Sequence, residues 1–262
     1  MMKAEHLTLT LNAAINAGKA ILEVYESPFA VEHKEDKSPL TLADKNAHQV
    51  ILQQLSSTGI PVLSEEGKII PFEERSQWSE LWVVDPLDGT KEFIKRNGEF
   101  TVNIALVKNG TAVFGVIYQP VGDVLFYGET GGGAYKINGA SKLKKEELIG
   151  HAVLLGNNIL PKTFTVVASR SHLSVETSDF VKNAKKKYGH VEFISSGSSL
   201  KLCMIAEQKA HVYPRFAPTM EWDTAAGHAI LKAAGKNIFS VTSGEELQYN
   251  KPDLRNDWFI AK

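Results

Sequence analysis

Three apolar runs follow one another closely in the first half of this sequence and limit its possible folds. They cover residues 100–107, 112–118 and 124–127, and short segments rich in Gly, Asn, Asp and Pro separate them. Such spacing is typical of strands joined by tight turns, which pair antiparallel because a parallel pair needs a much longer crossover. We therefore predict an antiparallel sheet in this half of the chain.

Two helices are predicted on the N-terminal side of these strands. Residues 7–25 carry apolar side chains at the three- and four-residue spacing of an amphipathic helix. A second helix is predicted over residues 41–56, with Thr41 as its N-cap and with Pro39 favouring an extended approach to it. The side chains expected on its buried face are Leu42, Val50, Ile51 and Leu55.

In the second half of the chain, the sequence predicts alternating strands and helices. We expect strands at residues 164–168, 191–194, 210–213 and 258–261, and helices at residues 175–187, 200–207 and 223–234. This alternation is typical of α/β proteins. The sequence thus predicts an α+β half, residues 1–145, packed on an α/β half, residues 146–262, with a cleft between them.

The charge balance excludes several classes of partner. The 262 residues include 29 Lys and Arg and 30 Asp and Glu, so the net charge of −1 provides no field to hold a nucleic acid polymer or an anionic membrane. Apolar runs stay well below the ~18–20 residues that span a bilayer. Cys203 is the single cysteine, so it forms no disulfide within the chain, and no secretory signal order opens the sequence. We expect a cytoplasmic protein without a transmembrane segment.

Residues 82–93 hold two aspartates three positions apart. We predict a strand that ends at Asp85, because Pro86 blocks its continuation, and then a tight turn at Asp88. Across that turn the two carboxylates converge, the Leu87 carbonyl becomes a third hard ligand, and the following backbone N–H groups point outward, as around a phosphate. The alternative is a solvated turn in which Asp88 caps its own backbone.

Two other acidic residues favour converging carboxylates over a solvated turn. Glu65 closes a predicted strand, and Asp223 opens a predicted helix, where a single Asp is otherwise most often an N-cap. If these two carboxylates join those of Asp85 and Asp88, their repulsion forces protonation unless cations neutralise it. Oxygen ligands select Mg²⁺ or Mn²⁺ over Zn²⁺. Two such ions about 4 Å apart would activate water and stabilise a leaving oxygen, which is phosphate-ester hydrolysis.

These motifs resemble a known family. Residues 85–90 (Asp-Pro-Leu-Asp-Gly-Thr), with Glu65 and Glu66 upstream, and residues 222–227 (Trp-Asp-Thr-Ala-Ala-Gly), are similar to the paired signatures of the inositol monophosphatase superfamily of lithium-sensitive, magnesium-dependent phosphatases. The resemblance covers nearly the whole chain. It implies a layered α-β-α-β-α sandwich of the sugar-phosphatase type.

Finer features resemble the bacterial 3'(2'),5'-bisphosphate nucleotidase branch, which is linked to sulfate assimilation. They lie at residues 90–93, 169–172, 197–201 and 247–251, whereas Asp257 departs from the branch, in which Pro is commoner. The resemblance implies that the chain removes the 3'-phosphate of adenosine 3',5'-bisphosphate to give AMP and phosphate, with 3'-phosphoadenylyl sulfate as a companion substrate. The alternatives are an inositol or sugar monophosphate phosphatase on the same scaffold and a non-catalytic metal- or nucleotide-binding regulator.

The resemblance also implies the metal ligands and the catalytic pair. A first ion would be held by Glu65, Asp85 and the Leu87 carbonyl, and a second by Asp85, Asp88 and Asp223. Glu66 would lie behind the direct ligands, and a third ion near Glu65 is left open. Asp44 and Thr90 would orient and help deprotonate the attacking water, since a Thr hydroxyl needs a carboxylate behind it. Taken alone, Asp44 is better explained as an exposed acid in a first helical turn.

A bisphosphate substrate also needs a second anion site. Lys201 and Arg215 are the candidates, with Ser198 and Ser199 donating from the start of a helix. The alternatives are a solvated Lys201, a surface ion pair for Arg215, and, for His172, either stacking on adenine or an exposed polar role. The residues expected to contact substrate are Glu65, Asp88, Gly89, Thr90, Lys91, His172, Ser198, Lys201, Arg215 and Asp223. The sequence leaves open whether the chain is a monomer or a homodimer and whether it associates peripherally with the inner membrane.

Overall fold

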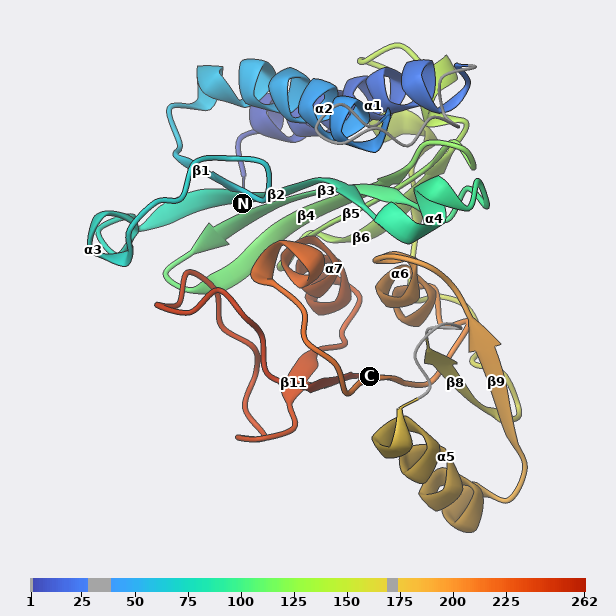
Figure 1. Cartoon of the computed structure of the whole chain (residues 1–262). Helices are drawn as coiled ribbons and strands as arrows, with labels where there is room; N and C mark the ends of the chain where they lie inside the picture. The colour runs from blue at the N-terminus through green and yellow to red at the C-terminus, as the bar shows by residue number, and fades with distance from the viewer. Residues whose placement is uncertain (1, 28–38, 169–173) are drawn as a thin grey trace.

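A computed structural model describes residues 2–27, 39–168 and 174–262 and arranges them in five layers (Figure 1). Helices α1 (Ala4–Tyr25) and α2 (Pro39–Leu55) cover one face of a seven-stranded sheet. Helices α6 (Leu200–Ala206) and α7 (Glu221–Ala233) cover the other face, and two small sheets and helix α5 (Val175–Tyr188) lie beyond them. This arrangement confirms the α-β-α-β-α order of layers that the resemblance implied.

The large sheet follows the chain order and is antiparallel except at one edge. Its strands, in order, are β1 (Val62–Ser64), β2 (Glu80–Asp88), β3 (Thr101–Lys108), β4 (Thr111–Gln119), β5 (Val124–Glu129), β6 (Gly133–Asn138) and β7 (Val153–Leu154). The three predicted runs become β3, β4 and β5. Strands β1 and β2 pair parallel, because a crossover that contains helix α3 (Phe72–Arg75) joins them. Strands β6 and β7 were not predicted.

Helix α2 differs from its prediction at its start and on its buried face. It begins at Pro39, since proline is well suited to the first helical position, so Thr41 is not the N-cap. Leu42 is 52% exposed. The fully buried face instead follows a four-residue spacing with two small side chains, which let the helix lie close to its neighbours: Ala43, Ala47, Ile51 and Leu55.

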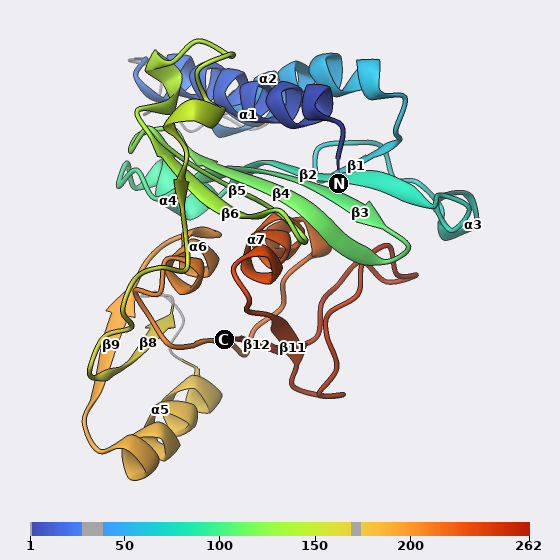
Figure 2. The ribbon, with the colours of Figure 1, turned by 180° about the vertical axis from the view of Figure 1, so that it is seen from behind.

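Helix α7 packs directly on the large sheet, as Figure 2 shows from behind. Its buried side includes several small residues, among them Ala225, Ala226 and Ala229. A Cβ atom added to Gly115 of β4 would lie 2.2 Å from the carbonyl oxygen of Ala226, so only glycine permits this close approach. The second half of the chain therefore supplies one cover of the sheet, and the division of the chain near residue 145 stays a prediction.

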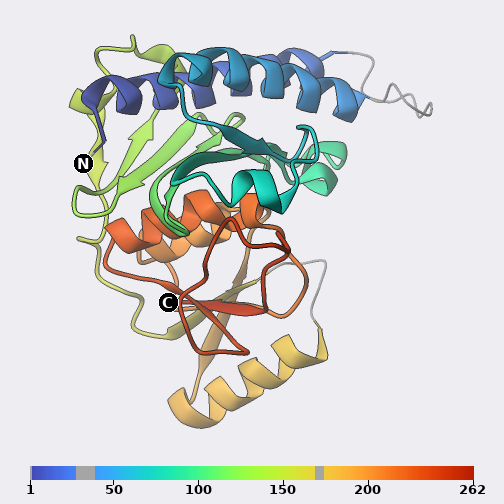
Figure 3. The same ribbon diagram turned by 90° about the vertical axis from the view of Figure 1, so that its left-hand side faces the viewer.

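The remaining elements form the outer layers, with α5 at the far end from α1 and α2 (Figure 3). Strands β8 (Phe164–Ala168) and β9 (Val191–Ser195) pair parallel. Strands β10 (Tyr213–Arg215), β12 (Phe259–Ala261) and β11 (Ile238–Ser240) pair antiparallel, and β11 was not predicted. Single turns complete the described chain: α4 (Thr90–Ile94), η2 (Ser56–Thr58), η3 (Ala140–Lys142) and η4 (Ile149–His151). Within the described residues, no helix is both long and apolar enough to cross a bilayer.

Candidate active site

Strand β2 brings two aspartates to one face of the sheet through a bulge. The predicted strand end at Asp85 is wrong, since β2 continues to Asp88. Asp85 pairs with Asn103 and Asp88 with Thr101, so two residues of β2, one of them Pro86, oppose a single residue of β3. Side chains three positions apart on a regular strand point to opposite faces, and one extra residue reverses that relationship. The bulge therefore directs both carboxylates toward the same side.

The backbone after Asp88 turns at Gly89 into helix α4. Gly89 has φ of +101°, and a Cβ atom there would lie 2.0 Å from Oγ of Ser198, so the turn requires glycine. Thr90 begins α4, a short helix that was not predicted. The turn thus places Thr90 beside the carboxylates of β2.

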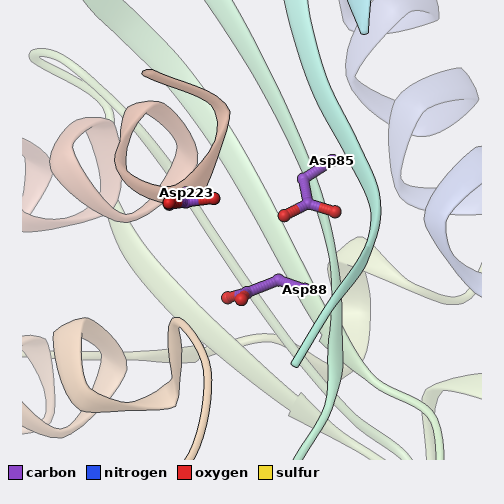
Figure 4. Close-up of side chains that lie close together, drawn as sticks. All are labelled: Asp85, Asp88 and Asp223. Carbon is purple, nitrogen blue, oxygen red and sulfur yellow. The ribbon is translucent and has the colours of Figure 1, made fainter. Parts of the chain in front are cut away.

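Asp223 reaches the same point from helix α7. It is the third residue of the helix, and its Oδ2 accepts a hydrogen bond from the backbone N–H of Met220 at 2.8 Å. Asp223 is therefore not the N-cap, although its carboxylate caps the first turn from within the helix. One ligand oxygen from each of Asp85, Asp88 and Asp223 lies within 4.8 Å of the others (Figure 4).

The electrostatics of this acidic cluster, Asp85, Asp88 and Asp223, favour a cation. Burial, and then the charge of Asp88, raise the pKa of Asp85 well above its ordinary value and that of Asp223 to about 7. Proteins neutralise clustered carboxylates either with protons or with metal ions. Buried oxygen donors that converge on one point are the ligands that a hard divalent cation prefers, so these residues fit Mg²⁺ or Mn²⁺.

Two further acids lie close to the cluster. Glu65 follows β1, its backbone N–H donates to the Val84 carbonyl at 3.1 Å, and burial raises the pKa of its carboxyl group. Asp44 lies on α2, past the first turn, so the explanation of Asp44 as a first-turn acid is wrong. Burial, followed by the charges of Glu66 and Glu65, raises the pKa of Asp44 to about 8. Glu66 itself is exposed.

A cavity of about 280 Å³ opens beside the acidic cluster. Of the described residues that the sequence had singled out, Asp44 and Glu66 do not line the cavity. Those that line it are Glu65, Asp85, Leu87, Asp88, Gly89, Thr90, Lys91, Ser198, Ser199, Lys201, Arg215 and Asp223. His172 lies outside the described residues, as does the segment 169–172 around it.

Two basic residues, Lys201 and Arg215, also line the cavity. Lys201 is only 5% exposed, which excludes the alternative of a solvated helix residue. Its Nζ donates to the carbonyls of Ser196 and Ser198, and burial lowers the pKa of Lys201 to about 8, against the opposing effect of Asp88. Nε of Arg215 is buried and has no hydrogen-bond partner among the described residues. Both cations are therefore placed to receive an anion.

Three residues make contacts that were not predicted from the sequence. Ser199 donates to the Asp88 carboxylate rather than into the cavity, and Asn103 of β3 contacts both residues. His48 lies one turn beyond Asp44 on α2 and contacts Oγ of Ser64 at 2.9 Å through Nδ1. A polar Asn inside an otherwise apolar strand was the one signal available in the sequence.

The fold and the site together define a metal-dependent phosphatase of the layered α/β type. Carboxylates that suit hard cations and two cations that suit a phosphate line the same cavity. The chain matches the model of the Inositol monophosphatase family over residues 2–258, and it belongs to this family.

Comparisons with individual proteins agree with this assignment. The chain is 46% identical over 240 residues to the 3'(2'),5'-bisphosphate nucleotidase CysQ of Salmonella typhimurium and 44% identical to that of Escherichia coli K12, with 90% of each chain covered. The crystal structure of CysQ from Bacteroides thetaiotaomicron superimposes with a TM-score of 0.94 at 51% identity, over 98% of this chain and 97% of that one. Inositol monophosphatase-II of Staphylococcus aureus, at 21% identity and a TM-score of 0.74 over 97% and 90%, shows the same fold.

Proposed function

We propose that this chain hydrolyses the 3'-phosphate of adenosine 3',5'-bisphosphate to AMP and inorganic phosphate, and that it acts on 3'-phosphoadenylyl sulfate at the same position. The relatives named as 3'(2'),5'-bisphosphate nucleotidases support this choice of substrate. The observation that carries it is a single cavity that is lined both by the acidic cluster and by two cations, Lys201 and Arg215. A bisphosphate has a second phosphate for these cations, whereas inositol monophosphate has none.

The acidic residues of the cavity would hold Mg²⁺. Two ions, with a third left open near Glu65, would be bound by Glu65, Asp85, the Leu87 carbonyl, Asp88 and Asp223. Bound cations supply Lewis acidity, which activates water and stabilises the leaving oxygen of a phosphate ester. The shared carboxylate of Asp85 is the residue that both ions would use.

Asp44 and Thr90 would together remove the proton of the attacking water. The Thr90 hydroxyl lines the cavity and would orient the water, while Asp44 would accept the proton through it. The carboxylate would supply the basicity that a Thr hydroxyl lacks by itself. The pairing of the two side chains is part of the proposal.

The non-reacting 5'-phosphate would lie against Lys201 and Arg215. Arg215 would donate through Nε, which has no partner among the described side chains, and Lys201 would contribute its charge. Gly89, Lys91 and Ser198 would complete the contacts, and His172 would stack on the adenine. We also propose that the enzyme is cytoplasmic and works as a monomer or a homodimer.

Side-by-side turnover decides between the candidate functions. With Mg²⁺ present, we expect kcat/KM for adenosine 3',5'-bisphosphate to exceed that for inositol 1-phosphate by more than about tenfold, because a paired charge is worth about 1.5–3 kcal/mol. A preference for inositol 1-phosphate would overturn the substrate. Nucleotide binding with Mg²⁺ but without phosphate release would instead indicate the non-catalytic regulator.

A further inference from the structure

Ser199 directs both of its hydrogen-bond donors at Asp88. The residue precedes helix α6 and is 4% exposed. Its backbone N–H and its hydroxyl each lie 2.7 Å from Oδ2 of Asp88, a residue 111 positions earlier in the chain. These donors are therefore committed to a carboxylate of the protein, and a substrate phosphate would have to use others.

The same hydroxyl also contacts helix α7. Oγ of Ser199 lies 2.9 Å from the backbone carbonyl oxygen of Asp223. Asp88 and Asp223 belong to the acidic cluster, and they stand on different elements, β2 and α7. One buried side chain on a third element thus joins two residues whose oxygens must converge.

Asn103 and Thr101 of β3 set the direction of the Ser199 hydroxyl. Oγ1 of Thr101 donates to Oδ1 of Asn103 at 3.0 Å, which fixes the orientation of the amide. Nδ2 of Asn103 then donates to Oγ of Ser199 at 2.9 Å and, more weakly, to Oδ2 of Asp88 at 3.4 Å. Since Oγ of Ser199 accepts from Asn103, its own hydrogen points to the oxygens of Asp88 and Asp223.

We propose that Ser199 is a positioning residue that holds the Asp88 carboxylate and the first turn of α7 in the geometry that a divalent cation requires. Three donors converge on Oδ2 of Asp88, so Oδ1 is the oxygen left to a cation. Ligands that are oriented in advance bind metal more tightly, and the loss of an outer hydrogen-bond partner typically costs 10- to 100-fold in metal affinity. The inference rests on the metal site of the proposed function.

Metal binding to the metal-free protein tests the role of Ser199 without any substrate. Titration with Mn²⁺, followed by the electron paramagnetic resonance signal of the free ion, gives the dissociation constant. For Ser199→Ala we expect this constant to rise by about tenfold or more. The matched control is Ser240→Ala, because Ser240 is also buried and its hydroxyl also donates to a carboxylate, that of Asp257, at 2.7 Å. It lies on β11 and lines no part of the cavity, so its Mn²⁺ affinity should stay at the wild-type value.

A second variant covers the case in which Ser199→Ala fails to fold. Thr101→Val keeps the shape of the side chain and removes only the donor that orients Asn103, so we expect a severalfold loss of Mn²⁺ affinity. Wild-type affinity in folded Ser199→Ala, or in Thr101→Val if that variant alone folds, overturns the role of Ser199 but leaves the proposed function intact. A wild-type chain that binds no Mn²⁺ overturns the metal site and this inference together.

Discussion

Asp85 and Asp88 are separated by two residues of β2, and both carboxylates face one cavity because a bulge in the strand lies between them. The bulge contains Pro86, which has no N–H to lose from the ladder. Asp223 arrives from α7 to complete the acidic cluster (Figure 4). Catalysis and metal binding should therefore depend on these oxygens, and stability should depend on how α7 meets the sheet.

Replacement of Asp88 or Asp223 by Asn should abolish activity and preserve the fold. Each substitution keeps the size of the side chain but removes a charged oxygen ligand, so phosphate release should fall by more than about 100-fold, the upper range for outer partners of a metal. Circular dichroism should show wild-type secondary structure. Near-wild-type turnover in both variants would contradict the metal assignment.

Removal of metal should destabilise the protein. A ligand that binds only the folded state at 100 times its dissociation constant adds about 2.7 kcal/mol of stability. The melting temperature should thus be lower in EDTA than in saturating Mg²⁺, and Asp223→Asn should lose most of this difference. Equal melting temperatures for the wild-type protein in the two buffers would count against a cation at this site.

A methyl group at Gly115 should separate α7 from the sheet. Its Cβ would meet the backbone of Ala226, so Gly115→Ala should cost about 1–3 kcal/mol in the free energy of unfolding and also reduce kcat, since Asp223 would move with the helix. Gly150→Ala is the control, because a Cβ there meets nothing within 4 Å. Urea unfolding and steady-state kinetics measure both effects. Equal stability of the two variants would refute the close approach.

His228 should make stability depend on pH. It is fully buried, it contacts Tyr249 and Asn237, and burial lowers its pKa from 6.5 to about 4. Between these values the unfolded chain binds more protons than the folded one, so stability falls as the pH falls. The contribution between pH 7 and pH 5 is roughly 2 kcal/mol. His228→Gln should lose less stability than the wild type over this interval by about that amount, as urea unfolding in EDTA would show; parallel profiles would exclude a neutral buried His228.

Arg215→Ala should distinguish the two phosphates of the substrate. We expect KM for adenosine 3',5'-bisphosphate to rise about tenfold or more, because a hydrogen bond to a charged group contributes about 1.5–3 kcal/mol, and KM for adenosine 3'-monophosphate to change little. Lys108→Ala removes an exposed charge paired with Glu80 and should change neither value. Equal effects of Arg215→Ala on both substrates would place the 5'-phosphate elsewhere.

Local patterns were enough to predict most helices and strands, the acids of the site and the family. Apolar periodicity is a property of neighbouring residues, so the strands β3, β4 and β5 and helix α5 were predicted close to their observed bounds. A motif of chemically suitable residues at a fixed spacing, such as residues 85–90, can be recognised from the sequence alone. Two predicted boundaries were wrong, the start of α2 and the end of β2. Both lie next to a proline, where the sequence allows either a break or a continuation of the element.

Relationships between distant segments appeared only in the folded chain. The direction of Asp88 depends on its register with β3, and the direction of Ser199 depends on a carboxylate 111 positions away. The close packing of Gly115 against Ala226 likewise joins β4 to α7. The direction and burial of a side chain depend on the residues that pack against it. When those residues are far away in the sequence, the local pattern of apolar residues does not reveal them. Residue types and their order therefore predicted the chemistry, and packing alone oriented the oxygens that perform it.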